Sequence, residues 1–176
     1  MDLIVTSDGT AELGDRRFPC AVGRGGIVDD KREGDGGTPM GVHSLLRVLY
    51  RPDRLAPPEG TLAVVPLRPD DGWCDAPEDV KYNRQVRLPY GASCEELWRD
   101  DRAYDLIVVT DFNDTPAVPH RGSGIFIHIA KPGFTPTEGC IAFLPEDLRL
   151  ILEQWRPADR VRVVDERVQP VIQPII

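Results

Sequence analysis

The sequence lacks the features that mark a membrane protein or a nucleic-acid-binding protein. No apolar window approaches the roughly 20 residues that a membrane-spanning helix needs. Lys and Arg number 21 against 29 Asp and Glu, which gives a formal net charge of -8. Binding to nucleic acid or to an anionic membrane surface depends on clustered Lys and Arg, because these neutralise phosphates. We therefore expect no nucleic-acid partner and no membrane span.

Cysteine is also scarce, and its spacing excludes an ordinary zinc site. The four cysteines are Cys20, Cys74, Cys94 and Cys140, and no two of them form a C-x-x-C pair. A chain of 176 residues with 41% hydrophobic composition can fold as one domain, residues 1–176, without disulfide staples. We expect reduced thiols and no metal. Cys20 is interpreted as a core residue, and Cys74 and Cys94 as incidental loop or helix thiols.

An export signal is absent from the N-terminal stretch "MDLIVTSDGT". The stretch has neither the basic leader nor the apolar region of a signal peptide. On this observation alone we expect a cytoplasmic location.

Proline and glycine, in contrast, are abundant, with 17 and 16 residues respectively. They separate short runs rich in β-branched and aromatic residues, which predicts a mainly β fold. Several of these runs are continuously apolar, as is typical of strands covered on both faces. The expected strands are residues 3–6, 16–23, 45–51, 62–68, 104–110, 125–130, 140–144 and 160–165.

Two short helices are also expected. "SCEELWRD", residues 93–100, begins with a serine followed three residues later by a glutamate, which is the pattern of a capping box. "PEDLRLILEQW", residues 145–155, has proline at the first helical position, two acidic residues in the first turn and one apolar face. The apolar C-terminal segment, residues 168–176, is expected to pack against the protein body or a partner.

Two long polar loops, residues 29–41 and 68–85, separate the expected strands. Loops held on a rigid scaffold often carry binding residues. The aromatic and amide side chains in or near these loops are candidates for substrate contacts, although each could equally stabilise its own loop. They are Trp73, Tyr82, Asn83 and Asn113.

The stretch "GSGIFIHIAKPGFTPTEGC", residues 122–140, contains the residues that best indicate chemistry. Strand alternation places His128 on the face opposite the three isoleucines of "IFIHI". Cys140 comes twelve residues after His128 and directly follows Gly139. Each residue alone is compatible with a buried structural role. Together they favour catalysis, because a nearby imidazole is the commonest means of activating a thiol.

This region resembles the catalytic domain of the L,D-transpeptidase family, the YkuD type. The mark of that family is a histidine on a strand followed by a Ser/Thr-x-Gly-Cys segment, here His128 and then "TEGC", residues 137–140. The upstream stretches "DGGTPMGVHSL" and "YDLIVVTDFN" are also similar to family segments. The resemblance implies a mainly β (α+β) fold, an L,D-transpeptidase-like β-sandwich of mixed sheets with one or two short helices.

The resemblance also implies a mechanism that needs no cofactor. Cys140 attacks a carbonyl of a peptidoglycan stem peptide or muropeptide, and His128 acts as general base. Backbone N–H groups near Gly139 and Cys140 stabilise the oxyanion, and the Thr137 hydroxyl orders the turn. An amine then resolves the thioester. The alternatives are hydrolysis, as in an L,D-carboxypeptidase or a crosslink-cleaving amidase, a non-catalytic module that binds wall peptides, and a thiol-based redox sensor.

The chain departs from the family pattern two residues after the cysteine, where Ala142 replaces a typical arginine. Arg121, Lys131 and Arg149 are candidates to supply the missing positive charge, and Arg121 and Lys131 are also candidates to contact substrate. Glu138 is expected to disfavour the thiolate. The family role implies the periplasm or cell wall, in contrast to the missing export signal, and the sequence leaves the oligomeric state open.

Overall fold

A computed structural model describes residues 1–167, so the C-terminal segment 168–176 lies outside the described residues. The fold is mainly β, as predicted, and every expected strand is present. Strands that were not expected are β2, β4, β5, β8, β9 and β10. The strands are β1 Leu3–Thr6, β2 Thr10–Leu13, β3 Arg16–Ala21, β4 Ile27–Val28, β5 Thr38–Pro39, β6 Gly41–Tyr50, β7 Val64–Pro66, β8 Asp71–Cys74, β9 Gln85–Arg87, β10 Cys94–Glu96, β11 Leu106–Thr110, β12 Phe126–Ile129, β13 Ile141–Phe143 and β14 Arg160–Val164.

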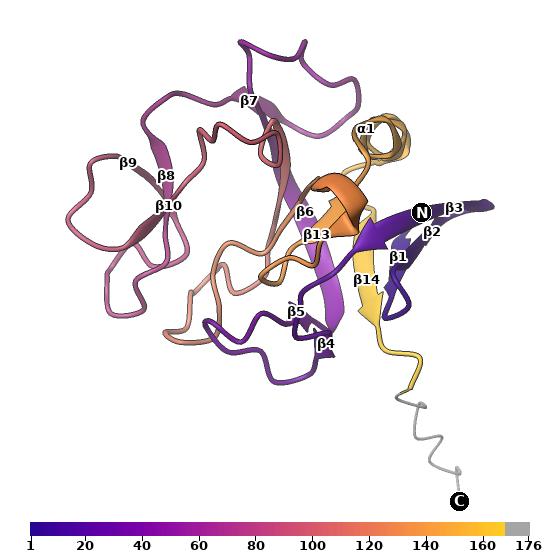
Figure 1. Cartoon of the computed structure of the whole chain (residues 1–176), viewed down its shortest axis with the longest axis horizontal. Coiled ribbons are helices and arrows are strands. Elements are labelled where there is room, and N and C mark those ends of the chain that lie inside the picture. Colours follow the sequence, from indigo (N-terminus) through magenta and orange to yellow (C-terminus); the bar gives the residue numbers. More distant parts are fainter. Residues whose placement is uncertain (168–176) are drawn as a thin grey trace, which may run out of the picture.

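The large sheet is mixed and closes on itself (Figure 1). Its strand order is β11-β12-β13-β3-β2-β1-β14-β6-β7, and β6 additionally pairs with β11. The long strand β6 makes this closure possible, because residues 41–44 pair with β14 while residues 45–50 pair with β11. The pairs β1–β14, β12–β13 and β6–β7 are parallel. Closure leaves β7 as the strand outside the ring.

The core is divided between the two faces of strands β11 and β12. Ile127 and Ile129 belong to the larger cluster, together with the buried residues of β1, β3 and α1. Phe126 belongs to a second cluster that also contains Trp73, Tyr104 and Cys140. Successive residues of a strand point to opposite faces, so His128 lies on the Phe126 face, as the alternation predicts. That second face carries the candidate site.

A separate three-stranded sheet, in the order β10-β8-β9, forms a lobe beside the large sheet (Figure 1). The predicted helix over residues 93–100 is wrong, because Cys94–Glu96 forms strand β10 and pairs antiparallel with β8. The segment with the capping-box pattern is too short to form a stable helix without tertiary support. Cross-strand pairing and the full burial of Leu97 hold the segment extended instead.

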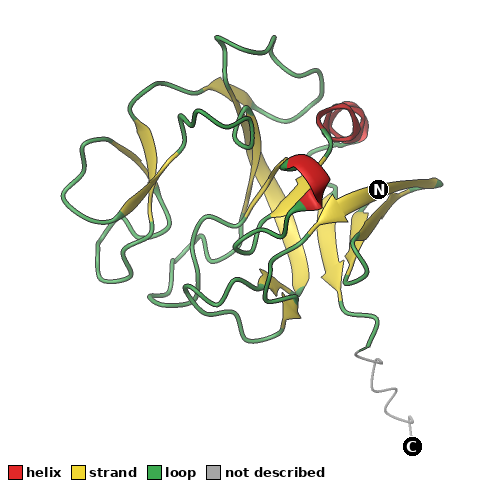
Figure 2. Cartoon of the chain, in the orientation of Figure 1, coloured by secondary structure: helices red, strands yellow, loops and turns green. Residues whose placement is uncertain are grey.

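The helix after β13 is correctly predicted. Helix α1, Pro145–Gln154, has proline in its first turn and buries Leu148, Ile151 and Leu152 against the larger cluster. Each such side chain contributes about 1.5–3 kcal/mol when fully buried. Figure 2 shows that the only other helical segment described is the short 3-10 turn η1, Pro132–Phe134. Among the described residues, no helix is long and apolar enough to cross a membrane.

Candidate active site

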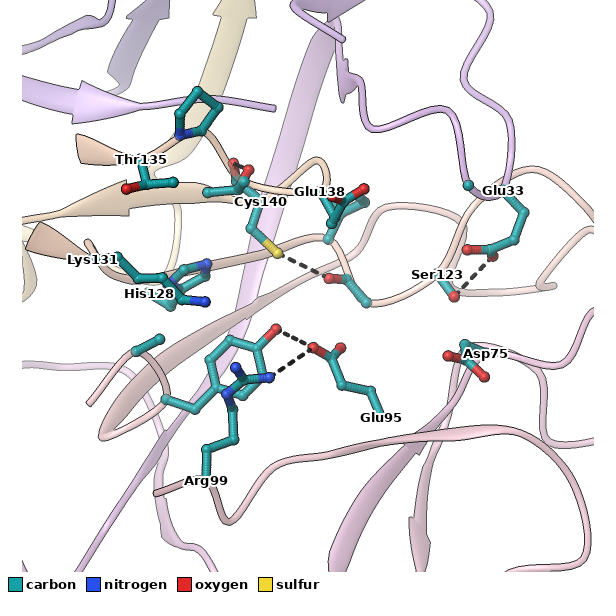
Figure 3. Close-up of a pocket in the computed structure, with 17 residues that line it drawn as sticks. Glu33, Asp75, Glu95, Arg99, Ser123, His128, Lys131, Thr135, Glu138 and Cys140 are labelled. Carbon is teal, nitrogen blue, oxygen red and sulfur yellow. Dashed lines mark hydrogen bonds and ion pairs between the residues drawn. The ribbon is translucent and has the colours of Figure 1, made fainter. Parts of the chain in front are cut away.

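His128 and Cys140 are brought together by two adjacent parallel strands. His128 lies on β12 opposite Ala142 of β13, and Cys140 immediately precedes β13. Both side chains line one cavity of about 480 Å³ (Figure 3). Their exposed fractions are 6% for His128 and 7% for Cys140, so the two groups are largely shielded from water. The strand pairing therefore fixes a thiol and an imidazole at the wall of the same pocket.

The His128 imidazole is oriented by a backbone carbonyl. Its Nδ1 lies 2.8 Å from the carbonyl oxygen of Ile129. A carbonyl can only accept a hydrogen bond, so Nδ1 carries the proton and Nε2 is left as an acceptor. Burial lowers the pKa of His128 to about 4, and the Ile129 carbonyl only partly opposes this. The imidazole is therefore neutral at physiological pH and available as a general base.

The Cys140 thiol is held by the backbone of β12, the strand that carries His128, and of the segment just before it. Its Sγ donates to the Gly124 carbonyl over 3.2 Å and accepts from the Phe126 N–H over 3.3 Å. Burial raises the pKa of Cys140 to about 12, and the negative charge of Glu95 adds to this effect. The resting pair is thus a neutral thiol beside a neutral imidazole. In such a pair, the thiol loses its proton only as the nucleophile attacks.

The turn before Cys140 has a backbone shape that requires glycine. Gly139 has a φ of +135°, and a Cβ at this position would lie 2.7 Å from the Gly37 carbonyl oxygen. The Thr137 hydroxyl donates to the Cys140 carbonyl over 2.6 Å and accepts from the Gly139 N–H over 3.1 Å. The Gly139 N–H is therefore occupied. The Cys140 N–H has no acceptor among the described residues, which leaves it the better placed of the two for an oxyanion.

A hydrogen-bonded group on the facing wall was not anticipated from the sequence. The Tyr104 hydroxyl donates to Glu95 Oε1 over 2.6 Å, and the Tyr104 ring packs edge-on to the His128 ring at 5.1 Å. The Arg99 guanidinium lies 3.9 Å from Glu95 Oε1. Burial raises the pKa of Glu95 and also that of Tyr104. The three side chains place one negative and one positive charge within the cavity.

The charges of the cavity are separated around Cys140. In Figure 3, Lys131 and Arg99 lie on the His128 side, and Glu33 and Asp75 lie on the other. The two cations are close enough to His128 to lower its pKa further, after burial. Asp75 Oδ1 is buried and has no hydrogen-bond partner among the described residues. The cavity lining therefore carries two cations on one side, both of which also pair with Asp101, and two acids on the other.

Some of the sequence-predicted residues line this cavity and others do not. Cys140, His128, Thr137 and Lys131 line it. The Lys131 ammonium lies 3.6 Å from Asp101 and is half exposed. Arg121 does not line it, because its exposed guanidinium pairs with Asp30 over 3.3 Å on the surface. Glu138 lines the rim, where it is paired with exposed Arg24, so Glu95 rather than Glu138 is the acid that raises the pKa of Cys140.

Trp73, Asn83 and Asn113 lie outside the cavity lining and stabilise the surrounding loops. The buried Trp73 indole donates to Asn83 Oδ1 over 2.9 Å. The same oxygen accepts from the Gly124 N–H over 2.9 Å, while Asn83 Nδ2 donates to the Asn113 carbonyl over 2.8 Å. The Asn113 side chain in turn closes its own loop by donating to the carbonyls of Val118 and Gly122. Because Gly124 also accepts from the Cys140 thiol, Asn83 supports the site indirectly.

Tyr82 also contributes indirectly rather than lining the cavity. Its hydroxyl donates to Glu33 over 2.5 Å and accepts from the Gly122 N–H over 3.0 Å. Glu33 lines the cavity and also accepts from Ser123 over 2.8 Å. The two polar loops, residues 29–41 and 68–85, thus reach the cavity through Glu33 and Asp75 rather than through the aromatic and amide residues that were predicted.

Comparison with known proteins identifies one family. Residues 3–163 match the family model YkuD, described as the L,D-transpeptidase catalytic domain. Comparison with curated proteins and with solved structures gave no match.

Proposed function

The chain belongs to the YkuD family of L,D-transpeptidase catalytic domains, and we propose that it transfers the acyl group of a peptidoglycan stem peptide to an amine through a thioester on Cys140. The observation that carries this proposal is the shared cavity of Cys140 and His128, with the imidazole Nε2 left free as an acceptor.

The first half-reaction forms the thioester. The sulfur of Cys140 attacks the donor carbonyl while His128 Nε2 takes the thiol proton. The oxyanion accepts a hydrogen bond from the Cys140 N–H, and the Ile129 carbonyl holds the new imidazolium through its Nδ1–H. When the tetrahedral intermediate collapses, His128 returns the proton to the leaving amine. The C–N bond breaks and the C–S bond remains.

The second half-reaction releases the product. An acceptor amine attacks the thioester carbonyl and gives up a proton to His128. As the second intermediate collapses, the C–S bond breaks and the imidazolium protonates the leaving thiolate. The resting neutral thiol and neutral imidazole are thereby restored, in accordance with the pKa directions of both groups.

The charge separation of the cavity supports one orientation of the donor. The leaving amino acid must lie near His128, because the imidazole protonates its amine. Arg99 and Lys131 lie on that side and suit the carboxylate of a terminal amino acid. The retained part of the donor then extends towards Glu33 and Asp75. Asp75 Oδ1, which has no hydrogen-bond partner among the described residues, suits an N–H or ammonium group. In this proposal, Arg99 and Lys131 replace the arginine that is absent at Ala142.

Product analysis tests this function. The purified protein is incubated with a disaccharide-tetrapeptide, with and without an added amine acceptor. We expect release of the terminal amino acid together with a new amide to the acceptor, and loss of both in Cys140→Ala. Cys20→Ala serves as the matched control, because Cys20 is a buried cysteine on β3 that does not line the cavity. Release of the amino acid with no acceptor product would instead establish hydrolysis of the same thioester, and turnover that survives in Cys140→Ala would overturn the proposal.

A further inference from the structure

Two cysteines that looked incidental in the sequence lie directly opposite each other in the small sheet. Cys94 of β10 is the register partner of Cys74 of β8. Both thiols are free. Side chains of directly opposed residues point to the same face of a sheet, so the two thiols are neighbours.

The hydrogen bonds on either side of this pair define its type. The Asp75 N–H donates to the Ser93 carbonyl over 3.2 Å, and the Leu97 N–H donates to the Asp71 carbonyl over 3.0 Å. Hydrogen-bonded and non-hydrogen-bonded pairs alternate along an antiparallel ladder, so Cys74 and Cys94 form a non-hydrogen-bonded pair. In such pairs the Cα atoms are about 4.5 Å apart, which is within the range of about 4.4–6.8 Å that disulfides span.

The environment of the pair leaves one thiol accessible. Cys74 is fully buried, whereas Cys94 is partly exposed. Burial raises the pKa of Cys94 to about 11, and the adjacent Cys74 thiol is the next largest cause. Because Cys94 is partly exposed, a reagent from solution can reach its thiol. The buried Cys74 thiol lies next to it and can act as the resolving thiol.

We propose that Cys74 and Cys94 are a dithiol site that closes to a reversible disulfide by exchange with a low-molecular-weight disulfide. The Cys94 thiolate attacks one sulfur of the small disulfide, forming a mixed disulfide and releasing one small thiol. The Cys74 thiolate then attacks the Cys94 sulfur, forming the intramolecular bond and releasing the second small thiol. The protein loses two protons and two electrons, and the small disulfide gains them as two thiols.

The two cysteines lie outside the cavity lining, and the exchange reaction does not depend on the proposed acyl transfer. The residues that follow the two cysteines, Asp75 and Glu95, both line the cavity. A disulfide between Cys74 and Cys94 ties together the two strands from which these acids project.

Peptide mapping of the oxidised full-length protein tests the proposal. The folded protein is incubated with excess glutathione disulfide, alkylated in acid and digested with trypsin without reduction. Each cysteine falls in a separate tryptic peptide, which are residues 18–24, 55–81, 88–99 and 122–149. We expect one linked product, 55–81 joined to 88–99, that disappears after treatment with dithiothreitol. Its rate of formation should rise about tenfold per pH unit below the pKa of the attacking thiol.

Variants and alternative products make the result decisive. Cys94→Ser should abolish the linked peptide, whereas Cys20→Ser, the matched control, should retain it. A glutathione adduct that persists on Cys94, a link to residues 18–24 or 122–149, or no linkage at alkaline pH would each overturn the proposal. Because the main measurement uses the unmodified chain, a variant that fails to fold does not affect it.

Discussion

We predict that iodoacetamide alkylates Cys140 about 1000-fold more slowly at neutral pH than it alkylates a free cysteine. Burial, followed by the charge of Glu95, raises the pKa of Cys140 from 9.0 to about 12. Only the thiolate reacts, and each pKa unit is a factor of ten in the thiolate fraction, so three units give about 1000-fold. The neutral His128 does not compensate, since its own pKa is lowered to about 4, mainly by burial.

The assay follows one peptide as a function of pH. Tryptic peptide 122–149 contains Cys140 as its only cysteine, so its alkylation can be timed by mass spectrometry in the unmodified protein. We expect the rate to rise with pH and to show no plateau near neutrality. Cys94, whose pKa is about 11, is an internal comparison in peptide 88–99. A fast rate that is independent of pH between about pH 6 and 8 would show a preformed thiolate–imidazolium pair and refute the reasoning.

Four further outcomes are expected. Between the unfolded pKa of 6.5 and the folded pKa of about 4, the unfolded state binds the His128 proton more strongly, so His128 should lower wild-type stability by about 3 kcal/mol as pH drops through this window. Urea unfolding should show a loss larger by about this amount in the wild type than in His128→Gln, because His43, whose pKa burial also lowers, is present in both proteins; equal losses would contradict this. Gly139→Ala should lower the free energy of unfolding by about 2 kcal/mol and block acylation. The backbone at position 139 has a φ of +135°, and the alanine Cβ would clash with the Gly37 carbonyl oxygen. Unchanged thermal unfolding would contradict this. Glu95→Gln should lower the pKa of Cys140 and speed its alkylation at a fixed pH, and a slower rate would count against the assigned electrostatics. Arg24→Ala should change stability by less than about 1 kcal/mol, because its ion pair with Glu138 is exposed; a larger loss in the same urea assay would be unexpected.

Local sequence patterns were sufficient for the strands that build the site. Every residue of β11, β12 and β13 is buried because both faces of these strands are covered, and the three runs are apolar apart from Thr110 and His128. Alternation placed His128 opposite the isoleucines, and the glycine-rich turn placed Cys140 at the start of the next strand. These features depend on periodicity over a few residues, which a sequence displays directly.

The facing wall of the cavity could not be derived in the same way. Glu95 and Arg99 lie in a segment whose capping pattern predicted a helix, but pairing of β10 with β8 holds it extended. Long-range pairing of this kind overrides a weak local preference. The cations that face the site, Arg99 and Lys131, therefore could not be distinguished from Arg121 by sequence alone. The register that places Cys74 opposite Cys94 also results from this long-range pairing, so local sequence patterns do not predict it.

The aromatic and amide residues in or near the loop of residues 68–85 show a different limitation. Trp73, Asn83 and Asn113 have the composition of a binding surface, yet their hydrogen bonds are made within the protein. Buried polar groups need internal partners, so an amide in a loop serves as readily to fix backbone as to bind a ligand. Amino-acid composition does not distinguish fixing the backbone from binding a ligand. The positions of the hydrogen-bond partners in the folded protein distinguish these two roles.

The most direct test of the central claim is the intact mass of the protein after reaction with a disaccharide-tetrapeptide donor or a carbapenem under reducing conditions. We predict an acyl adduct that maps to peptide 122–149, is absent in Cys140→Ala and is retained in Cys20→Ala. Failure of every donor to acylate the folded protein, or an adduct that persists in Cys140→Ala, would contradict an acyl-enzyme on Cys140.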